Sequence, residues 1–549
     1  MTQLNYKEQF PAAFPTLSPV QMREVAKIAK CRTYPDGTVL FKAGETEFKF
    51  HVIQKGEIEI IDRSGYKPRT ILTHGPLEFT GDIANLSGRT SHVDAVAKGT
   101  VEVYEICSSE LKMIISERPE LSETILKAFI ARGTALTESG FTGLRVIGSQ
   151  YSVDTFRIRD FLSKNGVLFT WTDVDHDEHA KELLEQFHIT ISETPIVAYS
   201  TEWLLKNPSN MQLAEKIGLK HELTDTLYDL VIAGGGPAGL AAAVYGASEG
   251  LKTMVLEKMA PGGQAGTSSR IENYLGFPTG VSGSELAARA TTQAEKFGAE
   301  LSIPSQIKSL SFEHKLNIIE LESGEKIKAK AVLIASGAAY RKLTVPELEQ
   351  YEGRGVYYAA TKMEADICAT DPVTVVGAGN SAGQAAIFLA SRVRKVYLIV
   401  RGAELAITMS KYLEQRIVET DNIELHFHTE ITKIMGDGHV EGVTIFNKKS
   451  DATEDLQVSA VFSFIGAMPH TAWLPSEIEK DEKGFIKTGV DAARSPLWTE
   501  QRAPFFLETT RPGIFAAGDV RSNSVKRVAS AVGEGSMAVQ FIHEHLKVV

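Results

Sequence analysis

Hydrophobic and polar residues alternate along residues 32 to 107, and short turn sequences interrupt them at regular intervals. The turns PDG (35 to 37), KAGE, QKGE and RSG separate apolar runs of strand length. Turns at this spacing predict a small all-β roll or barrel. From Ser108 to about Leu136 the apolar residues recur at helical spacing, which predicts one or two helices that close this domain.

The pattern changes in residues 143 to 222, where strand-like and helix-like stretches follow each other. LRVIGSQYSVDTFRIRDFLSKNGVLFTWTDVDHD predicts strand, loop, helix and strand, and HAKELLEQF predicts another helix. A strand is expected after Thr194-Pro195, followed by a turn and a closing helix. These elements predict a compact α/β domain, and the polar residues KHELTDT (220 to 226) predict a linker.

From Tyr228 onward the pattern is an apolar strand, a glycine loop and a helix, and the same pattern returns after Pro372. The recurrence predicts two doubly wound, Rossmann-like domains of parallel strands and helices. The uncharged run from Leu230 to Ser248 approaches the length of a membrane span. Three adjacent glycines and Pro237 near its start argue against a membrane helix.

The first glycine loop has the GxGxxG spacing of a dinucleotide-binding fingerprint. Its glycines allow a tight turn, close approach of a pyrophosphate, and close packing of helix on strand. The helix N-terminus carries about half a positive charge, and an acid about 20 residues later binds ribose hydroxyls. The predicted cofactor-binding residues are Gly234, Gly236, Pro237, Ala238, Gly239 and Glu257.

The second glycine loop repeats this design, but its second strand ends at a basic residue. The predicted binding residues are Gly377, Gly379, Asn380, Ser381, Ala382 and Arg401. An arginine at that position suits a 2′-phosphate, so NADPH is favoured over NADH. The sequence GNSAG also fits the nucleophile elbow of hydrolases, with Ser381 as nucleophile. The hydrolase hypothesis is weaker, because it leaves Gly377 and Arg401 unexplained and requires a later acid and histidine.

Composition and charge narrow the classes of partner. The chain of 549 residues has a formal net charge of -11 and a pI near 5.8, which disfavours nucleic acid and anionic membrane surfaces as partners. No targeting peptide is apparent, so a cytoplasmic location is predicted. The three cysteines form no CxxC pair and fit no metal spacing, and they are expected to be small core residues. No metal site is predicted.

Several further stretches resemble bacterial thioredoxin reductase across residues 226 to 549. They are PGGQAGTSSRIENYLGFP (261 to 278), LIASGA (333 to 338), GRGV, FSFIGAMP (462 to 469) and RPGIFAAGDVRSNSVKRVASAVGEGSMA (511 to 538). The resemblance implies FAD at the first loop. It places an NAD(P)H-binding domain, 344 to 467, within an FAD-binding domain formed by 226 to 343 and 468 to 549. It also implies a homodimer, and it adds the cofactor-binding residues Gly263, Gln264, Asn273, Gly337, Gly518, Asp519, Arg527, Val528 and Ala529.

The same resemblance exposes a missing dithiol. The family carries CATC after GRGV, and this chain has Ala359, Ala360, Thr361 and Lys362 there. Thiol-disulfide exchange at these positions is excluded, because neither alanine nor an ammonium group has thiol redox chemistry. We therefore expect an FAD-dependent NADPH oxidoreductase without protein catalytic residues. Its acceptor is expected to be ferredoxin or flavodoxin. A thioredoxin-like disulfide protein, a quinone or oxygen is an alternative, and a redox or nucleotide sensor with little turnover is the contrasting hypothesis.

The two N-terminal domains resemble known modules that lack key residues. Residues 143 to 222 resemble a thioredoxin-like domain with Ser149 and Ser152 at or near the cysteine positions. Residues 1 to 142 resemble a cyclic-nucleotide-binding domain, in which Gly81-Asp82 match the ribose-binding pair. Ser91-His92 stand where that family has its phosphate-binding arginine, and Arg89 is expected on a hairpin tip. Without a positioned guanidinium, a docking domain or a different ligand is favoured over a cyclic nucleotide.

Overall fold

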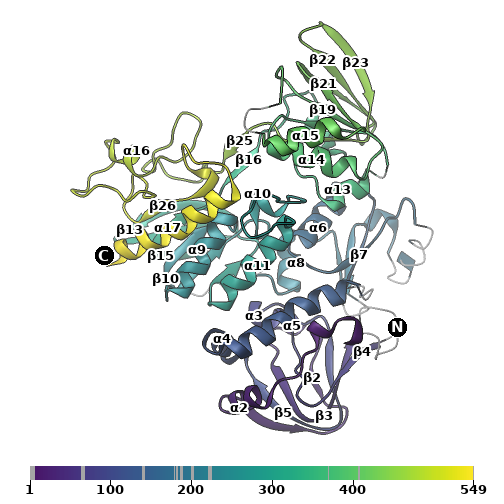
Figure 1. Ribbon diagram of the computed structural model, residues 1–549, viewed down its shortest axis with the longest axis vertical. Coiled ribbons are helices and arrows are strands. Elements are labelled where there is room, and N and C mark those ends of the chain that lie inside the picture. The colour runs from purple at the N-terminus through teal and green to yellow at the C-terminus, as the bar shows by residue number, and fades with distance from the viewer. Residues whose placement is uncertain are drawn as a thin grey trace.

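Four parts make up the chain in the computed structural model, which describes residues 7–63, 68–138, 143–177, 180, 184–185, 189–199, 203–220, 226–368, 370–405 and 409–547. We call them the N-terminal roll, the middle unit, and the first and second nucleotide domains. In Figure 1 the roll lies at the bottom, the first nucleotide domain in the middle and the second at the top. Residues 221 to 225 of the predicted linker, and much of the helix predicted at HAKELLEQF, lie outside the described residues.

The N-terminal roll is an antiparallel sheet with the order β1-β5-β3-β4, and β2 also pairs with β5. Its strands are β1 (Lys30–Tyr34), β2 (Val39–Phe41), β3 (Phe50–Asp62), β4 (Arg69–His74) and β5 (Asp94–Ile106). Its helices are η1 (Pro11–Ala13), α2 (Pro19–Ala26), α3 (Ala84–Ser87), α4 (Ser108–Glu117) and α5 (Pro119–Glu138). The predicted roll and its closing helices are confirmed.

The middle unit is a four-stranded sheet with the order β7-β6-β8-β9, in which β6 and β7 are parallel and the other pairs antiparallel. Its elements are β6 (Leu144–Ile147), α6 (Val153–Lys164), β7 (Phe169–Thr172), η2 (Ile191–Glu193), β8 (Ile196–Tyr199), β9 (Trp203–Lys206) and α8 (Asn210–Lys216). The Thr194-Pro195 peptide bond that precedes β8 is cis.

The first nucleotide domain is a sheet with the order β12-β11-β10-β15-β14-β13, and β26 pairs with β15. Its strands are β10 (Leu227–Ala233), β11 (Thr253–Leu256), β12 (Glu300–Ser302), β13 (Ile307–Glu313), β14 (Leu316–Leu321), β15 (Lys326–Ile334) and β26 (Ile514–Ala516). Its helices are α9 (Pro237–Ser248), α10 (Gly263–Gly266), α11 (Gly283–Lys296), α16 (Val490–Ala493), η3 (Gly518–Val520) and α17 (Val528–Leu546). Two distant stretches of chain therefore share one sheet.

The second nucleotide domain has a parallel sheet with the order β17-β24-β18-β19-β20 and a three-stranded antiparallel sheet, β21-β22-β23. The strands are β17 (Val356–Tyr357), β18 (Val373–Val376), β19 (Val396–Ile399), β20 (Ile423–His426), β21 (Thr429–Met435), β22 (Gly442–Asn447), β23 (Ala452–Gln457) and β24 (Ala460–Ser463). The helices are α12 (Leu348–Tyr351), α13 (Lys362–Ile367), α14 (Asn380–Ala390) and α15 (Lys411–Glu419). The antiparallel pair β16 (Ala338–Tyr340) and β25 (Ala467–Pro469) connects the two nucleotide domains.

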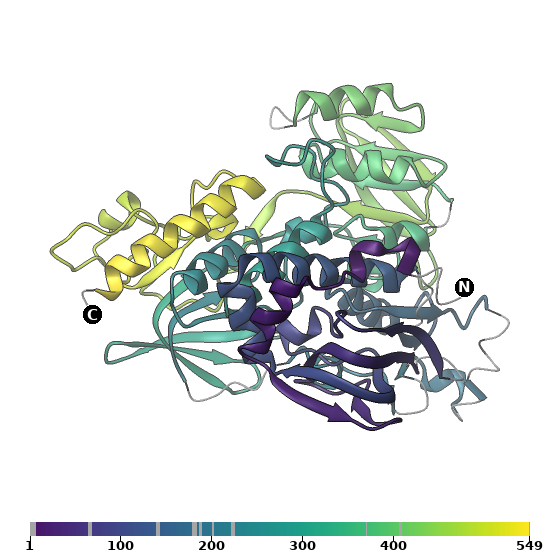
Figure 2. The same cartoon turned by 60° about the horizontal axis from the view of Figure 1, so that its bottom comes forward.

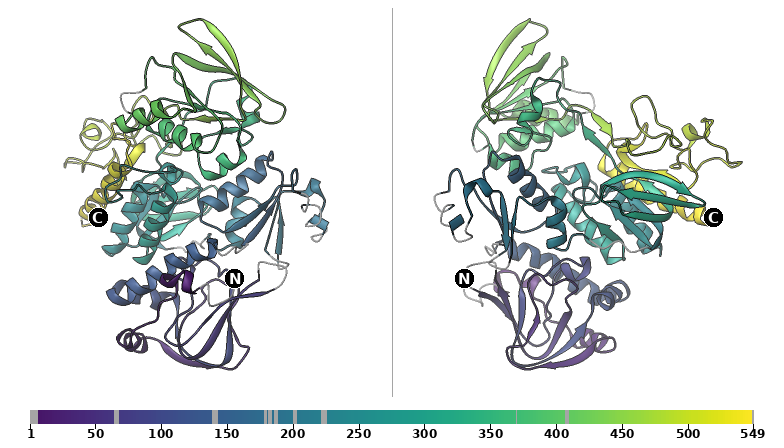
Figure 3. Two further views of the ribbon diagram at one scale, coloured as in Figure 1. Left: turned by 45° about the vertical axis from the view of Figure 1, so that its right-hand side comes forward. Right: turned by 180° about the vertical axis from the view of Figure 1, so that it is seen from behind.

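The middle unit lies between the roll and the second nucleotide domain, with α6 facing α13 (Figures 1 and 3). Figure 2 shows the roll from a second side, with its strands toward the viewer. Arg89 corrects an expectation: it follows α3, and its guanidinium donates to the Asn165 carbonyl of the middle unit at 3.1 Å. No helix among the described residues is both long and apolar enough to cross a membrane.

Candidate functional site

The first glycine loop joins β10 to α9 in a geometry that requires glycine at two positions. Gly234 has a φ of +112°, and a Cβ there would lie 2.5 Å from the Ala335 carbonyl oxygen. A Cβ on Gly239 would lie 1.9 Å from the Gly234 carbonyl oxygen. Gly236 is the N-cap of α9, and no side chain caps the first N–H groups of this helix. These N–H groups are therefore open at this end of the helix. The loop can therefore receive a pyrophosphate.

Glu257 follows β11 and turns its carboxylate toward the same loop. It accepts hydrogen bonds from the backbone N–H groups of Gly235 at 2.7 Å and Met259 at 2.9 Å. Burial raises the pKa of this carboxyl, and the backbone N–H groups act in the opposite direction. The carboxylate is thus held at the place where a ribose hydroxyl can donate to it.

Three other segments with predicted residues converge on this loop. Gly263 of α10 approaches Gly236, because a Cβ on Gly263 would lie 3.1 Å from the Gly236 Cα. A Cβ on Gly518 of η3 would lie 3.1 Å from the Ala238 Cβ of α9. The Gly518 N–H donates a hydrogen bond to the Glu534 carboxylate at 2.7 Å. The structure therefore gathers the start of α9, α10 and η3 around one space.

Asp519 lies in η3 beside this convergence, and burial raises the pKa of its carboxyl. The remaining predicted residues have fewer contacts that tie them to the first glycine loop. Gln264, Asn273, Arg527 and Ala529 are exposed, Gly337 precedes β16 with a φ of +63°, and Val528 begins α17. No side-chain contact among the described residues joins Asn273 or Arg527 to the first loop.

The second glycine loop joins β18 to α14 in the same manner. Gly377 has a φ of +144°, and a Cβ there would lie 2.9 Å from the Phe464 carbonyl oxygen and 3.0 Å from the Ala382 Cβ. Gly379 is the N-cap of α14 and leaves its N–H groups open. Asn380 accepts a hydrogen bond from the Ser410 N–H at 2.8 Å. Arg401 follows β19 with an exposed side chain, and none of the described residues pairs with its guanidinium.

Tyr340 connects the second glycine loop to the strand pair that joins the two nucleotide domains, a role that the sequence did not predict. It belongs to β16, and its hydroxyl donates to the Ser381 Oγ at 2.7 Å. Burial raises the pKa of the Tyr340 phenol, and the negative charge of Asp519 acts in the same direction. Ser381 lies within the first turn of α14 and shares its hydroxyl with a tyrosine, which does not favour the hydrolase hypothesis.

A second contact between the nucleotide domains is an ion pair. The Arg416 guanidinium of α15 lies 2.8 Å from the Glu272 carboxylate, next to Asn273 in the first domain. Both side chains are partly exposed, at 44% and 26%. This pair therefore links α15 of the second domain to the segment of the first domain that contains Asn273.

The positions of the family dithiol form a helix cap in this chain. Thr361 is the N-cap of α13, and its N–H donates to Glu364 at 2.8 Å. Ala360 is buried, and Lys362 lies 3.6 Å from Asp366 on the surface. Cys368 is buried and burial raises the pKa of its thiol to about 12, so it holds no thiolate at neutral pH.

The expectation that all three cysteines are core residues is wrong for Cys31, whose side chain is exposed. Cys107 has intermediate solvent exposure. In the middle unit, Ser149 donates to Asp175 at 2.5 Å, and Ser152 is the N-cap of α6. Both serines therefore have ordinary structural contacts. No group of three or more His, Cys, Asp or Glu side chains among the described residues can hold a metal ion.

The roll contains a small apolar cavity at the place where its resemblance predicts a nucleotide. The cavity measures about 50 Å³ and its lining includes Gly81, Asp82 and Ser91. Arg132 of α5 reaches into it and donates to the carbonyl oxygens of Ala13 at 2.8 Å and Phe79 at 3.0 Å. Drug-sized ligands need cavities of roughly 300 Å³ or more, so this conformation has no room for a nucleotide.

Comparisons with known proteins agree with this geometry. Residues 228–535 match the family model of pyridine nucleotide-disulphide oxidoreductases, and residues 31–118 match that of cyclic nucleotide-binding domains. Thioredoxin reductase of Peptoclostridium litorale is 34% identical over 320 residues, which cover 57% of this chain and 95% of that protein.

Two solved structures cover the same part of the chain. Lactococcus lactis thioredoxin reductase in its FR conformation has a TM-score of 0.53 at 30% identity and covers 59% of this chain and 100% of its own. T. acidophilum thioredoxin reductase has a TM-score of 0.52 at 30% identity, and the alignment covers 58% of this chain and 98% of that protein.

Proposed function

Because the chain belongs to the pyridine nucleotide-disulphide oxidoreductase family, we propose that it is an FAD-dependent NADPH oxidoreductase that passes electrons to an external acceptor without a dithiol. The observation that carries this proposal is the pair of glycine loops at the N-termini of α9 and α14, together with a segment, residues 359 to 362, that contains no cysteine. The cofactors supply the hydride chemistry, and the protein supplies binding and alignment.

The residues at the first loop fit FAD. The open N-terminus of α9 suits the pyrophosphate, and the Glu257 carboxylate suits the ribose hydroxyls. Asp519 and the start of α17 would complete the site near the ribityl chain and the flavin ring. A Cβ at Gly234 or Gly239 would collide with neighbouring backbone atoms. This restriction to glycine supports a loop whose backbone a pyrophosphate approaches closely.

The residues at the second loop fit NADPH better than NADH. The N-terminus of α14 suits the pyrophosphate, and the free guanidinium of Arg401 suits a 2′-phosphate. Ser381 and Tyr340 would orient the nicotinamide end toward the first domain. Alignment of two bound cofactors in this manner replaces a bimolecular encounter and accelerates hydride transfer.

The acceptor takes electrons directly from the flavin, because the chain offers no thiol relay. Ferredoxin or flavodoxin is our leading acceptor class, and a thioredoxin-like protein, a quinone or oxygen is the alternative. Three isolated cysteines, of which Cys368 is buried and held protonated, do not form an internal disulfide relay. We further propose a cytoplasmic homodimer, as the resemblance to thioredoxin reductase implies.

Anaerobic stopped-flow mixing with NADPH, and then with NADH, tests the proposal through the flavin absorbance near 450 nm. Fast bleaching with NADPH and slower bleaching with NADH are expected. The reduced protein is then mixed with ferredoxin, flavodoxin, or thioredoxin, and reoxidation by a one-electron carrier but not by thioredoxin is expected. Absence of bleaching with both nucleotides contradicts the oxidoreductase proposal.

A regulatory role is the second candidate, and contacts of the roll favour it. Residues 89 to 92, which replace the phosphate-binding segment, contact the middle unit: Thr90 donates to the Ile217 carbonyl at 3.2 Å, and Tyr199 donates to the His92 carbonyl at 3.1 Å. A ligand in the roll would therefore act on the middle unit directly. Slow turnover with every acceptor, together with ligand-dependent partner binding, would support this role.

A further inference from the structure

The middle unit is joined to the first nucleotide domain through a common hydrophobic cluster. Ile158 and Leu213 of the middle unit belong to the same cluster as Leu230 of β10. Polar contacts reinforce the joint, since the Asn165 side chain donates to the Met259 carbonyl at 2.9 Å and Lys220 pairs with Glu325 at 2.9 Å. The middle unit therefore forms one body with the first domain.

The same unit also reaches the second nucleotide domain through Phe156 of α6. The Phe156 ring packs against the core of that domain, with its centroid 5.4 Å from the Tyr357 ring of β17. The backbone of Gly353 approaches closely, because a Cβ there would lie 3.4 Å from the Phe156 ring and 3.9 Å from Val153. Phe156 is thus partly buried against the core of the second domain.

Charge complements this apolar contact. The Arg159 guanidinium, also on α6, stacks over Trp171 at 3.6 Å and interacts electrostatically with Glu364 and Asp366 of α13. Burial lowers the pKa of Arg159 to about 10, so the group stays cationic at neutral pH. The attraction acts over a distance, since none of the described acids forms an ion pair with Arg159, and it favours an orientation of α6 that keeps this cation near the acids of α13.

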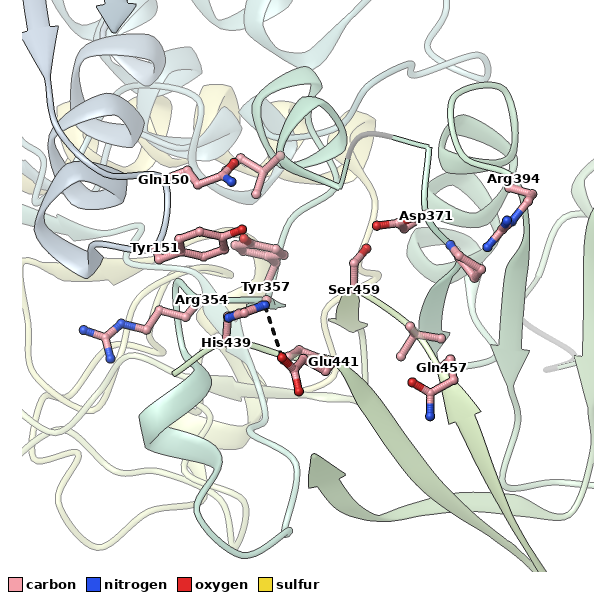
Figure 4. Close-up of a pocket in the computed structure, with 15 residues that line it drawn as sticks. Gln150, Tyr151, Arg354, Tyr357, Asp371, Arg394, His439, Glu441, Gln457 and Ser459 are labelled. Atoms are coloured by element: carbon pink, nitrogen blue, oxygen red, sulfur yellow. Dashed lines mark ion pairs between the residues drawn. The ribbon is translucent and has the colours of Figure 1, made fainter. Parts of the chain in front are cut away.

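The edge of the contact is polar and contains a cavity of about 340 Å³, shown in Figure 4. Gln150 and Tyr151, from the loop after β6, line one side, and the second nucleotide domain lines the rest. The rings of Tyr151 and His439 contact each other in the lining of the cavity, with ring centroids 4.6 Å apart. The loop at Ser149 to Ser152 therefore lies at the second domain and shares the cavity with Tyr357 and Ile367.

We propose that residues 353 to 368 form a docking surface for a thioredoxin-fold domain, and that the chain's own middle unit occupies it. Because the middle unit is also joined to the first nucleotide domain, it holds the two nucleotide domains in a fixed relative orientation. A free thioredoxin cannot use this surface, so electrons leave the flavin by another face.

A cross-link across the cavity tests the docking without reference to electron transfer. Tyr151→Cys and His439→Cys are combined in a Cys31→Ser, Cys107→Ser background, in which buried Cys368 is the remaining native thiol, and the full chain is treated with a short bis-maleimide. Near-complete intramolecular cross-linking is expected, and a variant with only one of the two introduced cysteines should give none. Cross-linking of only a small fraction would overturn the docking, even if the protein reduces flavin normally.

The cross-linked protein then tests whether the docked arrangement is the working one. NADPH should bleach its flavin within about twofold of the unlinked rate, and a loss of more than about tenfold would overturn the support role. If the unlinked protein is not bleached at all, the proposed function fails, and the cross-linking yield still decides the docking.

A surface variant provides a second measurement. Phe156→Asp should slow flavin bleaching by at least about tenfold, because it removes an aromatic contact and places a carboxylate beside Tyr357. Arg157→Gln is the matched control on the same helix, since Arg157 contacts Asp154 and the Pro208 carbonyl of its own unit. Equal bleaching rates for the two variants, with FAD content and melting temperature unchanged, would overturn the support role.

Discussion

At the residue scale, we expect Arg401 to favour NADPH over NADH. Its exposed guanidinium has no partner among the described residues and lies after β19, where a ribose phosphate is expected. Arg401→Ala should raise the KM for NADPH by about ten- to a hundredfold, because a charge-assisted hydrogen bond contributes roughly 1.5 to 3 kcal/mol.

Steady-state kinetics with both nucleotides measures this effect. The KM for NADH should change little, since NADH has no 2′-phosphate to pair with the guanidinium. An unchanged ratio of kcat/KM for the two nucleotides would assign the 2′-phosphate to another residue.

His74 makes the stability of the roll depend on pH. Burial lowers its pKa to about 4, while an unfolded histidine titrates near 6.5. Between these values the unfolded chain binds more protons, so stability is complete above about pH 6.5 and is lost as the pH falls toward 4. The expected loss between pH 7 and pH 5 is about 2 kcal/mol.

Scanning calorimetry of the full chain at pH 7 and pH 5 measures this loss in the transition of the roll. His74→Gln should remove most of the pH dependence in that window, because glutamine does not titrate. The neighbouring Glu78 does not interfere, since its pKa is lowered to about 2 and it titrates below the window. The same pH dependence in His74→Gln would refute the assignment.

At the element scale, α15 contacts the loop at Glu272 through Arg416, and this pair helps to align the nucleotide domains. Arg416→Glu should slow flavin bleaching by NADPH about two- to fivefold, because partly exposed ion pairs contribute only about 0.2 to 1 kcal/mol. The charge swap Arg416→Glu with Glu272→Arg should restore the rate. Failure of the swap, with an intact fold, would show that the pair does not act through its charges.

The sequence predicted the elements around the loops well, because local rules govern them. The glycine loops, the strands before them and the helices after them follow from positive φ values and close approaches that only glycine permits. Tyr340 could not be predicted, since its contact with Ser381 depends on how β16 places one domain against the other. The helix cap at Thr361 was equally hidden, although the sequence TKME carries its signal.

At the scale of the whole molecule, the number of redox centres limits what the protein can do. The sequence contains three cysteines, and all are free. An anaerobic dithionite titration should therefore consume two electrons per FAD and stop. Uptake of about four electrons per FAD would reveal a second two-electron centre and contradict direct transfer from the flavin.

The sequence by itself determined the kinds of domain and the absence of the dithiol, because motif spacing and residue chemistry are local properties. It predicted an FAD-type and an NADPH-type loop, and it showed that residues 359 to 362 contain no cysteine. Only the tertiary structure decided that Arg132 lines the cavity of the roll, that Cys31 is exposed, and that Phe156 joins the middle unit to the second domain. These are contacts between residues far apart in the chain, and no local pattern encodes their geometry.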